Sequence, residues 1–170
     1  DPCNQKEIDD ILIKMDGTSN KSMLGANSIL SVSMACAKVA ALSQGKELYQ
    51  HLSILFNGKE ITNGDLKLPT PVFNIINGGE HAKNELSFQE FMVIPALNTP
   101  YNKALEMGVN IYKDLKKLLL EEGFETGVGD EGGFMPMGLS ARTALDFLEE
   151  AASVQYNPGN DVFFGLDIAA

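Results

Sequence analysis

The stretch GVGDEGGF, residues 127–134, places two neighbouring acids among glycines. Asp130 and Glu131 repel each other as carboxylates, and the glycines around them lose much backbone entropy on folding. Glycines let a backbone take positive φ angles and approach a ligand closely. The repulsion between the two acids falls if one of them binds a donor or a metal and the other stays protonated. A carboxyl group near other carboxylates has a raised pKa, which suits a general acid at neutral pH. The alternative is an acidic turn on the surface.

Two further carboxylates stand on predicted strands. Glu90 interrupts an apolar strand face between Phe88 and Met92, although an edge strand with one face in water explains it equally well. Asp167 ends the apolar run VFFGLD, where a charged group is costly unless it is paired or bound to a metal. In α/β barrels a polar residue at the C-terminal end of a strand points into the active site. The alternative role for Asp167 is to cap a following helix.

His81 and Gln89 lie close to these acids in the sequence. His81 follows INGGE at a predicted strand end, where an imidazole can approach an anion or transfer a proton; an exposed loop histidine is the alternative. Gln89 precedes Glu90, and a regular strand sends these two side chains to opposite faces. Both reach one ligand only if the strand is irregular there or the ligand lies at its end. Three carboxylates and a histidine in an acidic chain indicate a bound cation.

The composition is that of a globular protein with an acidic surface. The chain has 170 residues, of which 44% are hydrophobic and 21% charged, and its formal net charge is −10. Such a charge repels phosphate backbones and disfavours nucleic-acid binding. No apolar run approaches the length that we expect of a membrane span. The two cysteines, Cys3 and Cys36, have neither disulfide nor metal spacing, which agrees with a reducing cytosol.

The elements that must position these residues follow from periodicity and end signals. Helices are predicted within residues 6–17, 26–45, 47–58, 99–123 and 139–154, with Gly17 as a C-cap and Thr99 and Ser140 as N-caps. Strands are predicted within residues 71–79, 86–95 and 161–170, and residues 58–71 form a linker. Helices followed by strand, strand, helix, helix and strand favour an α/β fold over an all-α fold.

Four segments together resemble the enolase family. They are DGTSNKSMLGANSILSVSMACAKVAA, PTPVFNIINGGEHAKNELSFQEFMVIP, GVGDEGGF and GLDIAA, and they occur in the order that the family has. The resemblance covers the chain from about Asp16 to Ala170. It implies an α/β fold: residues 1–66 form the helical end of an N-terminal α+β domain with its linker, and residues 67–170 form the first strands and helices of a (β/α) barrel. Enolases extend further at both ends, so we expect an internal part of a longer chain.

The resemblance also implies a reaction and a role for each candidate residue. The reaction is that of a hydro-lyase, the phosphopyruvate hydratase of glycolysis, which interconverts 2-phospho-D-glycerate and phosphoenolpyruvate with Mg²⁺ in the cytoplasm. Glu131 matches the acid that helps to expel the substrate hydroxyl, and Glu90 matches the second carboxylate of that cluster. His81, Gln89 and Glu90 match substrate contacts, and Asp167 matches the first of three carboxylate ligands of magnesium. The other two ligands, the lysine base and the phosphate-binding residues have no match in this sequence, so we expect these residues alone to be inactive.

The same resemblance implies the partners. They are a small phosphorylated carboxylate and, in the full-length protein, a second copy in a homodimer. Neither nucleic acid nor a membrane span is expected, on the separate grounds of net charge and apolar run length given above. Met135 and Met137 stand where the family usually carries Ala and Asn, a departure that concerns the packing of that loop rather than the acids. Two alternatives stay open: an enolase-superfamily enzyme that acts on another carboxylate, and a non-catalytic interaction protein that retains part of the fold.

Overall fold

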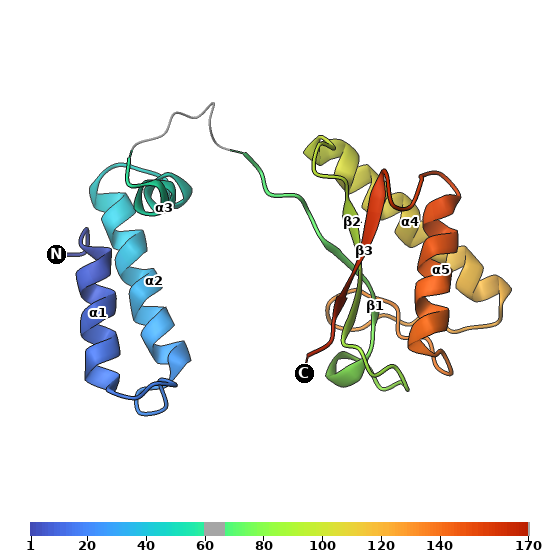
Figure 1. The fold of residues 1–170 in the computed structure, drawn as a ribbon, viewed down its shortest axis with the longest axis horizontal. Coiled ribbons are helices and arrows are strands. Elements are labelled where there is room, and N and C mark those ends of the chain that lie inside the picture. The colour runs from blue at the N-terminus through green and yellow to red at the C-terminus, as the bar shows by residue number, and fades with distance from the viewer. Residues whose placement is uncertain (60–66, 170) are drawn as a thin grey trace. The chain divides into compact units, whose positions relative to one another are not determined.

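The computed structural model describes residues 1–59 and 67–169. They belong to two compact units, Asp1–Lys67 and Leu68–Ala170. Three α-helices lie in the first unit, and the second contains strand, strand, helix, helix and strand in that order (Figure 1). The predicted α/β fold class is therefore confirmed.

The first unit is helical. α1 (Gln5–Asp16) and α3 (Leu48–Asn57) each pack on α2 (Ala26–Ser43). α1 ends at Gly17, which has a left-handed φ of 70° and thus confirms the predicted C-cap. Asp16 is buried, and its carboxylate accepts hydrogen bonds from the backbone N–H groups of Leu24 at 2.7 Å and Met23 at 3.1 Å. These bonds, that from Leu24 above all, lower the pKa of Asp16 and close the loop between α1 and α2.

α2 corrects one expectation about membranes. The sequence predicts no apolar run near the length of a span, yet the helix Ala26–Ser43 is long and apolar enough to cross a membrane by length and composition alone. Its buried residues are Ala37, Ala40 and Ala41. One helix of this kind is weak evidence for a span, because core helices of globular proteins have the same length and composition.

The second unit is built on a three-stranded antiparallel sheet. β1 (Phe73–Asn77) pairs with β2 (Glu90–Pro95), and β2 pairs with β3 (Val162–Asp167). The short 3₁₀ helix η1 (Gly79–His81) follows β1. Phe91, Val93 and Pro95 of β2 are buried, while the residues between them are partly exposed, as the twofold period of a strand requires. The two faces of the sheet are therefore distinct.

Two helices cover one face of this sheet. α4 (Tyr101–Glu121) and α5 (Ala141–Ser153) pack on each other, and both contact β2 (Figure 1). The core between helices and sheet includes Phe91, Val93, Ile111, Leu115 and Leu148, all of which are fully buried. We call the other side, which carries Glu90, Met92 and Ile94 of β2 with their β3 partners Asp167, Gly165 and Phe163, the open face.

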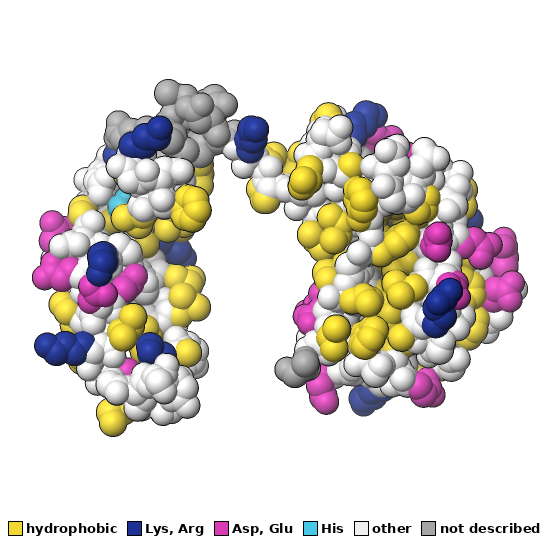
Figure 2. All heavy atoms as spheres, viewed as in Figure 1, with side chains coloured by type: hydrophobic (Ala, Val, Ile, Leu, Met, Phe, Trp, Pro, Cys, Tyr) yellow, Lys and Arg dark blue, Asp and Glu magenta, His cyan; other side chains and the backbone are white. Residues whose placement is uncertain are grey.

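Hydrophobic side chains are exposed on both units. Figure 2 shows them as patches on the visible side of each unit. On β3, Phe163 is 45% exposed, although it is a large aromatic residue in a strand. The α-helices of residues 67–169 that contact β2 are α4 and α5, and both pack on the covered face. Among the described residues of this unit, no α-helix therefore packs on the open face.

The ends of the two long helices test the predicted caps. Ser140 caps α5 by accepting a hydrogen bond from the N–H of Thr143 at 3.1 Å, which confirms its predicted role. α4 instead begins at Tyr101 with Pro100 as its N-cap, one residue later than the cap at Thr99 predicted.

The apolar spacing within residues 99–123 predicts a buried stripe made of Leu105, Gly108, Ile111, Leu115 and Leu118 or Leu119. This prediction is right at four places and wrong at one. Gly108, Ile111, Leu115 and Leu119 are buried, but Leu105 is 47% exposed. Ala104 and Met107 fill the first turns instead. The buried stripe therefore differs from the prediction only in the first turns of the helix.

β2 begins at Glu90 and not at Leu86. The preceding backbone is bonded to the glycine pair after β1: the N–H of Gly79 donates to the carbonyl of Leu86 at 2.7 Å, and the N–H of Gly78 donates to the carbonyl of Gln89 at 3.0 Å. A Cβ at Gly78 would lie 2.3 Å from the carbonyl oxygen of Phe88, so only glycine permits this approach. Residues 86–89 therefore belong to a loop that leads into the strand.

Gly108→Ala is expected to destabilise the second unit. A Cβ at Gly108 would lie 2.7–2.8 Å from three ring atoms of Phe73 on β1, so the ring or the helix must move. Overpacking of this kind costs about 1–3 kcal/mol, and the better helix propensity of alanine returns at most about 1 kcal/mol. Urea titration of the variant should therefore show a lower midpoint of unfolding. Val109→Ala, at a position 43% exposed on the same helix, is the control and should change little; a Gly108→Ala variant as stable as the control would show that this contact does not set the packing.

Candidate functional site

Acidic residues meet at one edge of the sheet. Because the strands are antiparallel, the end of β1, the start of β2 and the end of β3 lie in one row, in which Asn77 pairs with Glu90 and Glu90 pairs with Asp167. Paired residues of neighbouring strands point to the same face of a sheet. Glu90 and Asp167 therefore lie together on the open face, opposite to the hydrophobic core.

The GVGDEGGF segment is attached to this edge through β1. The N–H of Phe134 donates to the carbonyl of Ile75 at 2.8 Å, and the N–H of Asn77 donates to the carbonyl of Phe134 at 2.9 Å. The ring of Phe134 stacks on Tyr112 of α4, with 4.3 Å between centroids. The hydroxyl of Tyr112 donates to the carbonyl of Gly132 at 2.8 Å. Strand and helix together hold the loop that carries Glu131.

The glycines of this segment make room for a buried side chain. Asn77 is fully buried, and a Cβ at Gly133 would lie 2.2 Å from its Oδ1, while a Cβ at Gly129 would lie 2.5 Å from its Nδ2. Gly132 has a positive φ of 84°, as the sequence analysis expected of a glycine here. Glycine is thus needed at these positions because the loop backbone lies against the side chain of Asn77 on β1. The sequence pattern alone did not suggest this reason.

His81, Glu90 and Glu131 form a close cluster of functional groups, with candidate ligand atoms within 4.8 Å of one another. Nδ1 of His81 lies 3.1 Å from Oε2 of Glu131 and 3.8 Å from Oε1 of Glu90. Nδ1 makes no hydrogen bond to either acid, although its distance to Glu131 is short enough for one. The contact is therefore electrostatic, and it becomes an ion pair when the imidazole is protonated.

The electrostatics of the cluster act mainly on Glu90. Burial raises the pKa of Glu90 above its ordinary value of 4.5, and the charges of Glu131 and Asp167 raise it further. A hydrogen bond between the carboxyl groups of Glu90 and Glu131 acts in the same direction, whereas the charge of His81 opposes it. The structure therefore favours the protonated form of Glu90 more than water does.

The other two predicted residues join the site in different ways. Asp167 lies beside Glu90 in the register, and its Oδ1 accepts a hydrogen bond from the N–H of Ala169 at 2.9 Å. Gln89 is linked through its backbone, since its N–H donates to the carbonyl of Asp167 at 2.9 Å. The irregular loop before β2 thus places Gln89 at the edge where the acids meet. Asp167 is outside the group of three, whose candidate ligand atoms all lie within 4.8 Å of one another.

Asn74 on β1 is a site residue that the sequence analysis missed. Its Nδ2 donates to Oε2 of Glu131 at 2.9 Å. The available signal was an asparagine in the otherwise apolar run PVFNII, where an amide needs a partner. That partner lies 57 residues further along the chain, so the sequence pattern did not reveal it.

Family models match both units. A model described as the enolase C-terminal TIM barrel domain matches residues 65–170, and one described as the enolase N-terminal domain matches residues 1–52. The chain belongs to the enolase family. This membership confirms the resemblance drawn from the motifs and supports a lyase of the enolase superfamily, whose enzymes act on small molecules and typically use Mg²⁺.

The donor set of this enolase-family site fits a hard cation. Carboxylate oxygens are the ligands that Mg²⁺ prefers. Glu90 and Glu131 supply them within the group that also includes His81, and Asp167 adds a third carboxylate beside Glu90 in the strand register. Within residues 1–59 and 67–169, no Lys or Arg forms an ion pair with these three acids. The negative charge of the site is therefore left for a proton, the imidazole or a metal ion to balance.

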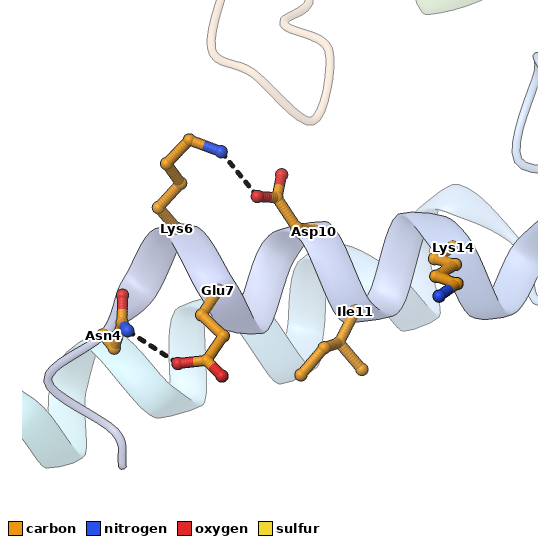
Figure 3. Close-up of a pocket in the computed structure, with 6 residues that line it drawn as sticks. All are labelled: Asn4, Lys6, Glu7, Asp10, Ile11 and Lys14. Atoms are coloured by element: carbon orange, nitrogen blue, oxygen red, sulfur yellow. Dashed lines mark hydrogen bonds and ion pairs between the residues drawn. The ribbon is translucent and has the colours of Figure 1, made fainter.

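A hollow on the first unit lacks this convergence of groups. It is lined by Asn4, Lys6, Glu7, Asp10, Ile11 and Lys14 (Figure 3). Lys6 pairs with Asp10, and Nδ2 of Asn4 donates to Oε2 of Glu7 at 2.6 Å. These polar groups pair along one helix rather than converging on a common point, so we place the candidate site at the sheet edge.

Glu90→Gln is expected to stabilise the fold at neutral pH but not at acid pH. The folded state raises the pKa of Glu90 above 4.5, so it binds this proton more tightly than the unfolded chain does. The contribution of Glu90 to stability is full below the unfolded pKa and is lost as pH rises through the raised pKa of the folded state. Glutamine is neutral throughout and keeps that contribution at all pH values.

Thermal unfolding in EDTA, at about pH 4 and about pH 8, measures this difference on either side of the ordinary pKa of a glutamate. The variant should melt higher than the wild type at the alkaline pH only. Glu149→Gln on the exposed side of α5 is the control for loss of one negative charge. A variant that melts lower than the wild type at alkaline pH would contradict the raised pKa of Glu90.

Proposed function

We propose that the protein containing this sequence is a phosphopyruvate hydratase that interconverts 2-phospho-D-glycerate and phosphoenolpyruvate. The observation that carries the proposal is the cluster on an enolase-family chain in which His81 Nδ1 lies 3.1 Å from Glu131 and 3.8 Å from Glu90. Such a cluster combines a proton donor, a second acid that supports it and a cationic group for an anionic substrate. A cytoplasmic homodimer is part of the proposal on the strength of the family resemblance.

Glu131 is proposed as the acid that protonates the departing hydroxyl. The reaction removes a weakly acidic proton next to a carboxylate and then expels hydroxide, which is a poor leaving group unless it is protonated as it departs. The side chain of Glu131 is 47% exposed, so it can reach a substrate, while that of Glu90 is 21% exposed. Because burial and the charges of Glu131 and Asp167 raise the pKa of Glu90, this pair of acids can keep a proton at this edge for the elimination step.

His81 and Gln89 are proposed to orient the substrate. A protonated His81 would attract the phosphate or the carboxylate of the substrate, and its Nδ1 lies 3.1 Å from Glu131 and 3.8 Å from Glu90. Gln89 lies in the loop directly before β2, where its amide can donate to or accept from substrate oxygens. Both residues stand beside Glu90, which is proposed to share in substrate contact.

Asp167 is proposed as a ligand of Mg²⁺. Its carboxylate ends β3 on the open face, and the hydrogen bond from the N–H of Ala169 to Oδ1 orients it. When bound, magnesium stabilises the negative charge that develops on the substrate carboxylate as the proton leaves. Asp167 also supplies part of the negative field that raises the pKa of Glu90.

Glu131→Gln in the full-length enzyme is expected to lower kcat by about 10²–10⁴-fold, the usual contribution of a general acid, with little change in KM. Glutamine keeps the shape and the hydrogen-bonding capacity of the side chain but cannot supply the proton. Formation of phosphoenolpyruvate from 2-phosphoglycerate, followed by its ultraviolet absorbance, is the measurement. Glu125→Gln, an exposed acid in the same connection, is the matched control. An unchanged kcat would remove the acid role from Glu131.

Asp167→Asn is expected to weaken magnesium binding by roughly tenfold or more, because a neutral amide replaces a charged ligand. Calorimetric titration of the metal-free enzyme with Mg²⁺ measures the change directly. Asp146→Asn on α5, where the acid is 58% exposed and pairs with Arg142, controls for the loss of one negative charge. Wild-type affinity in the Asp167 variant would exclude this residue from the metal site.

A further inference from the structure

We propose that Asn74 is a positioning residue that holds Glu131 in the orientation needed for proton transfer. This inference rests on the proposed role of Glu131 as the acid. Its basis is the hydrogen bond of 2.9 Å from Nδ2 of Asn74 to Oε2 of Glu131. In the described part of the chain, Asn74 is the only residue whose N–H group is aligned on that carboxylate, since Nδ1 of His81 is near it without satisfying a hydrogen bond.

A bulge in β1 points Asn74 toward the acids. Asn74 pairs with Met92 and Asn77 pairs with Glu90, so both asparagines lie on the open face. In a regular strand two residues three positions apart point to opposite faces. The register shifts between Asn74 and Ile76, and this irregularity places both amides on the side of Glu90. Bulges are known to redirect side chains beside active sites in this way.

Gly133 shows how closely the two amides approach the acid loop. A Cβ on Gly133 would lie 2.2 Å from Oδ1 of Asn77 and 3.3 Å from Oδ1 of Asn74. The loop is therefore seated on both side chains, two residues after Glu131. Asn77 lies under the backbone of the loop, whereas Asn74 reaches the carboxylate itself.

The neighbourhood of Asn74 indicates that its amide serves Glu131 rather than the core. Its Oδ1 is buried without a hydrogen-bond partner among the described residues, while its Nδ2 is bonded to Glu131. If the side chain at position 74 served only to fill space, an apolar residue would do so without leaving a buried polar atom unpaired. Asn74 thus leaves one buried acceptor unpaired. Its other polar atom orients Glu131, whose side chain is 47% exposed on a glycine-rich loop.

Loss of this bond should reduce turnover more than binding. Glu131 would then sample positions away from the leaving group, and small misplacements of a catalytic group reduce rates strongly. We expect Asn74→Ala to lower kcat by about tenfold with KM changed less than about threefold, because hydrogen bonds to charged groups are stronger than neutral ones. Asn102→Ala, on the exposed side of α4, is the matched control and should keep wild-type kinetics.

The test is a double-mutant cycle in the full-length enzyme, with Asn74→Ala, Glu131→Gln and the double variant assayed for 2-phosphoglycerate dehydration. If Asn74 acts through Glu131, its substitution lowers kcat in the wild-type background and has little further effect beside Glu131→Gln. An equal loss in both backgrounds, or no loss while Glu131→Gln is crippled, would overturn the inference and leave the proposed function intact. A Glu131→Gln variant with normal kcat would instead overturn the proposed acid role, and this inference with it.

Asn74→Asp separates an electrostatic role from a role in folding. Aspartate keeps the shape of the side chain but places a second carboxylate 2.9 Å from Glu131, so kcat should fall below that of Asn74→Ala. A purely structural role predicts the reverse order, because alanine leaves the larger cavity. Circular dichroism and melting temperatures of both variants show whether the fold is retained. An Asn74→Asp variant that is folded and more active than Asn74→Ala would contradict the positioning role.

Discussion

The structure of the candidate site depends on the repulsion among carboxylates that antiparallel pairing brings together. Glu90 lies between Asp167 in the strand register and Glu131 on the neighbouring loop. Burial makes this repulsion stronger, because fewer water molecules screen the charges. The site therefore retains a proton, attracts a cation or places an imidazole between the acids, and each of these is useful in a reaction that moves a proton and stabilises an anion.

The hydrophobic core on the covered face supports this unfavourable arrangement. Phe134 joins the acid loop to the core by stacking on Tyr112, and Tyr112 in turn holds the carbonyl of Gly132. α4 thus connects the packing of the sheet to the position of Glu131. The same helix approaches β1 so closely that Gly108 contacts the ring of Phe73. Residues with no chemical role consequently determine where the acid lies.

Sequence patterns were most reliable where a local rule operates. Gly17 and Ser140 end and begin helices through their own backbone and side-chain bonds, so their roles could be predicted from neighbouring residues. The exposure of Leu105 and the start of β2 were predicted wrongly because both depend on residues distant in the sequence. The exposure of Leu105 depends on how α4 packs, and the start of β2 depends on the backbone bonds of the loop at Gly78. Asn74 was missed for the same reason, since its partner lies on another segment.

Residue types and motif order alone determined the family, the fold class and the candidates Glu90, Glu131, His81, Gln89 and Asp167. Such information is local, because motifs report which groups a chain carries and in what order. Only the tertiary structure decided that His81 lies between Glu131 and Glu90, that the raised pKa falls on Glu90, and that a bulge turns Asn74 toward the acid. Distances between side chains and their exposure to water arise from the pairing of remote segments, and these two quantities control the strength of every electrostatic interaction in the site.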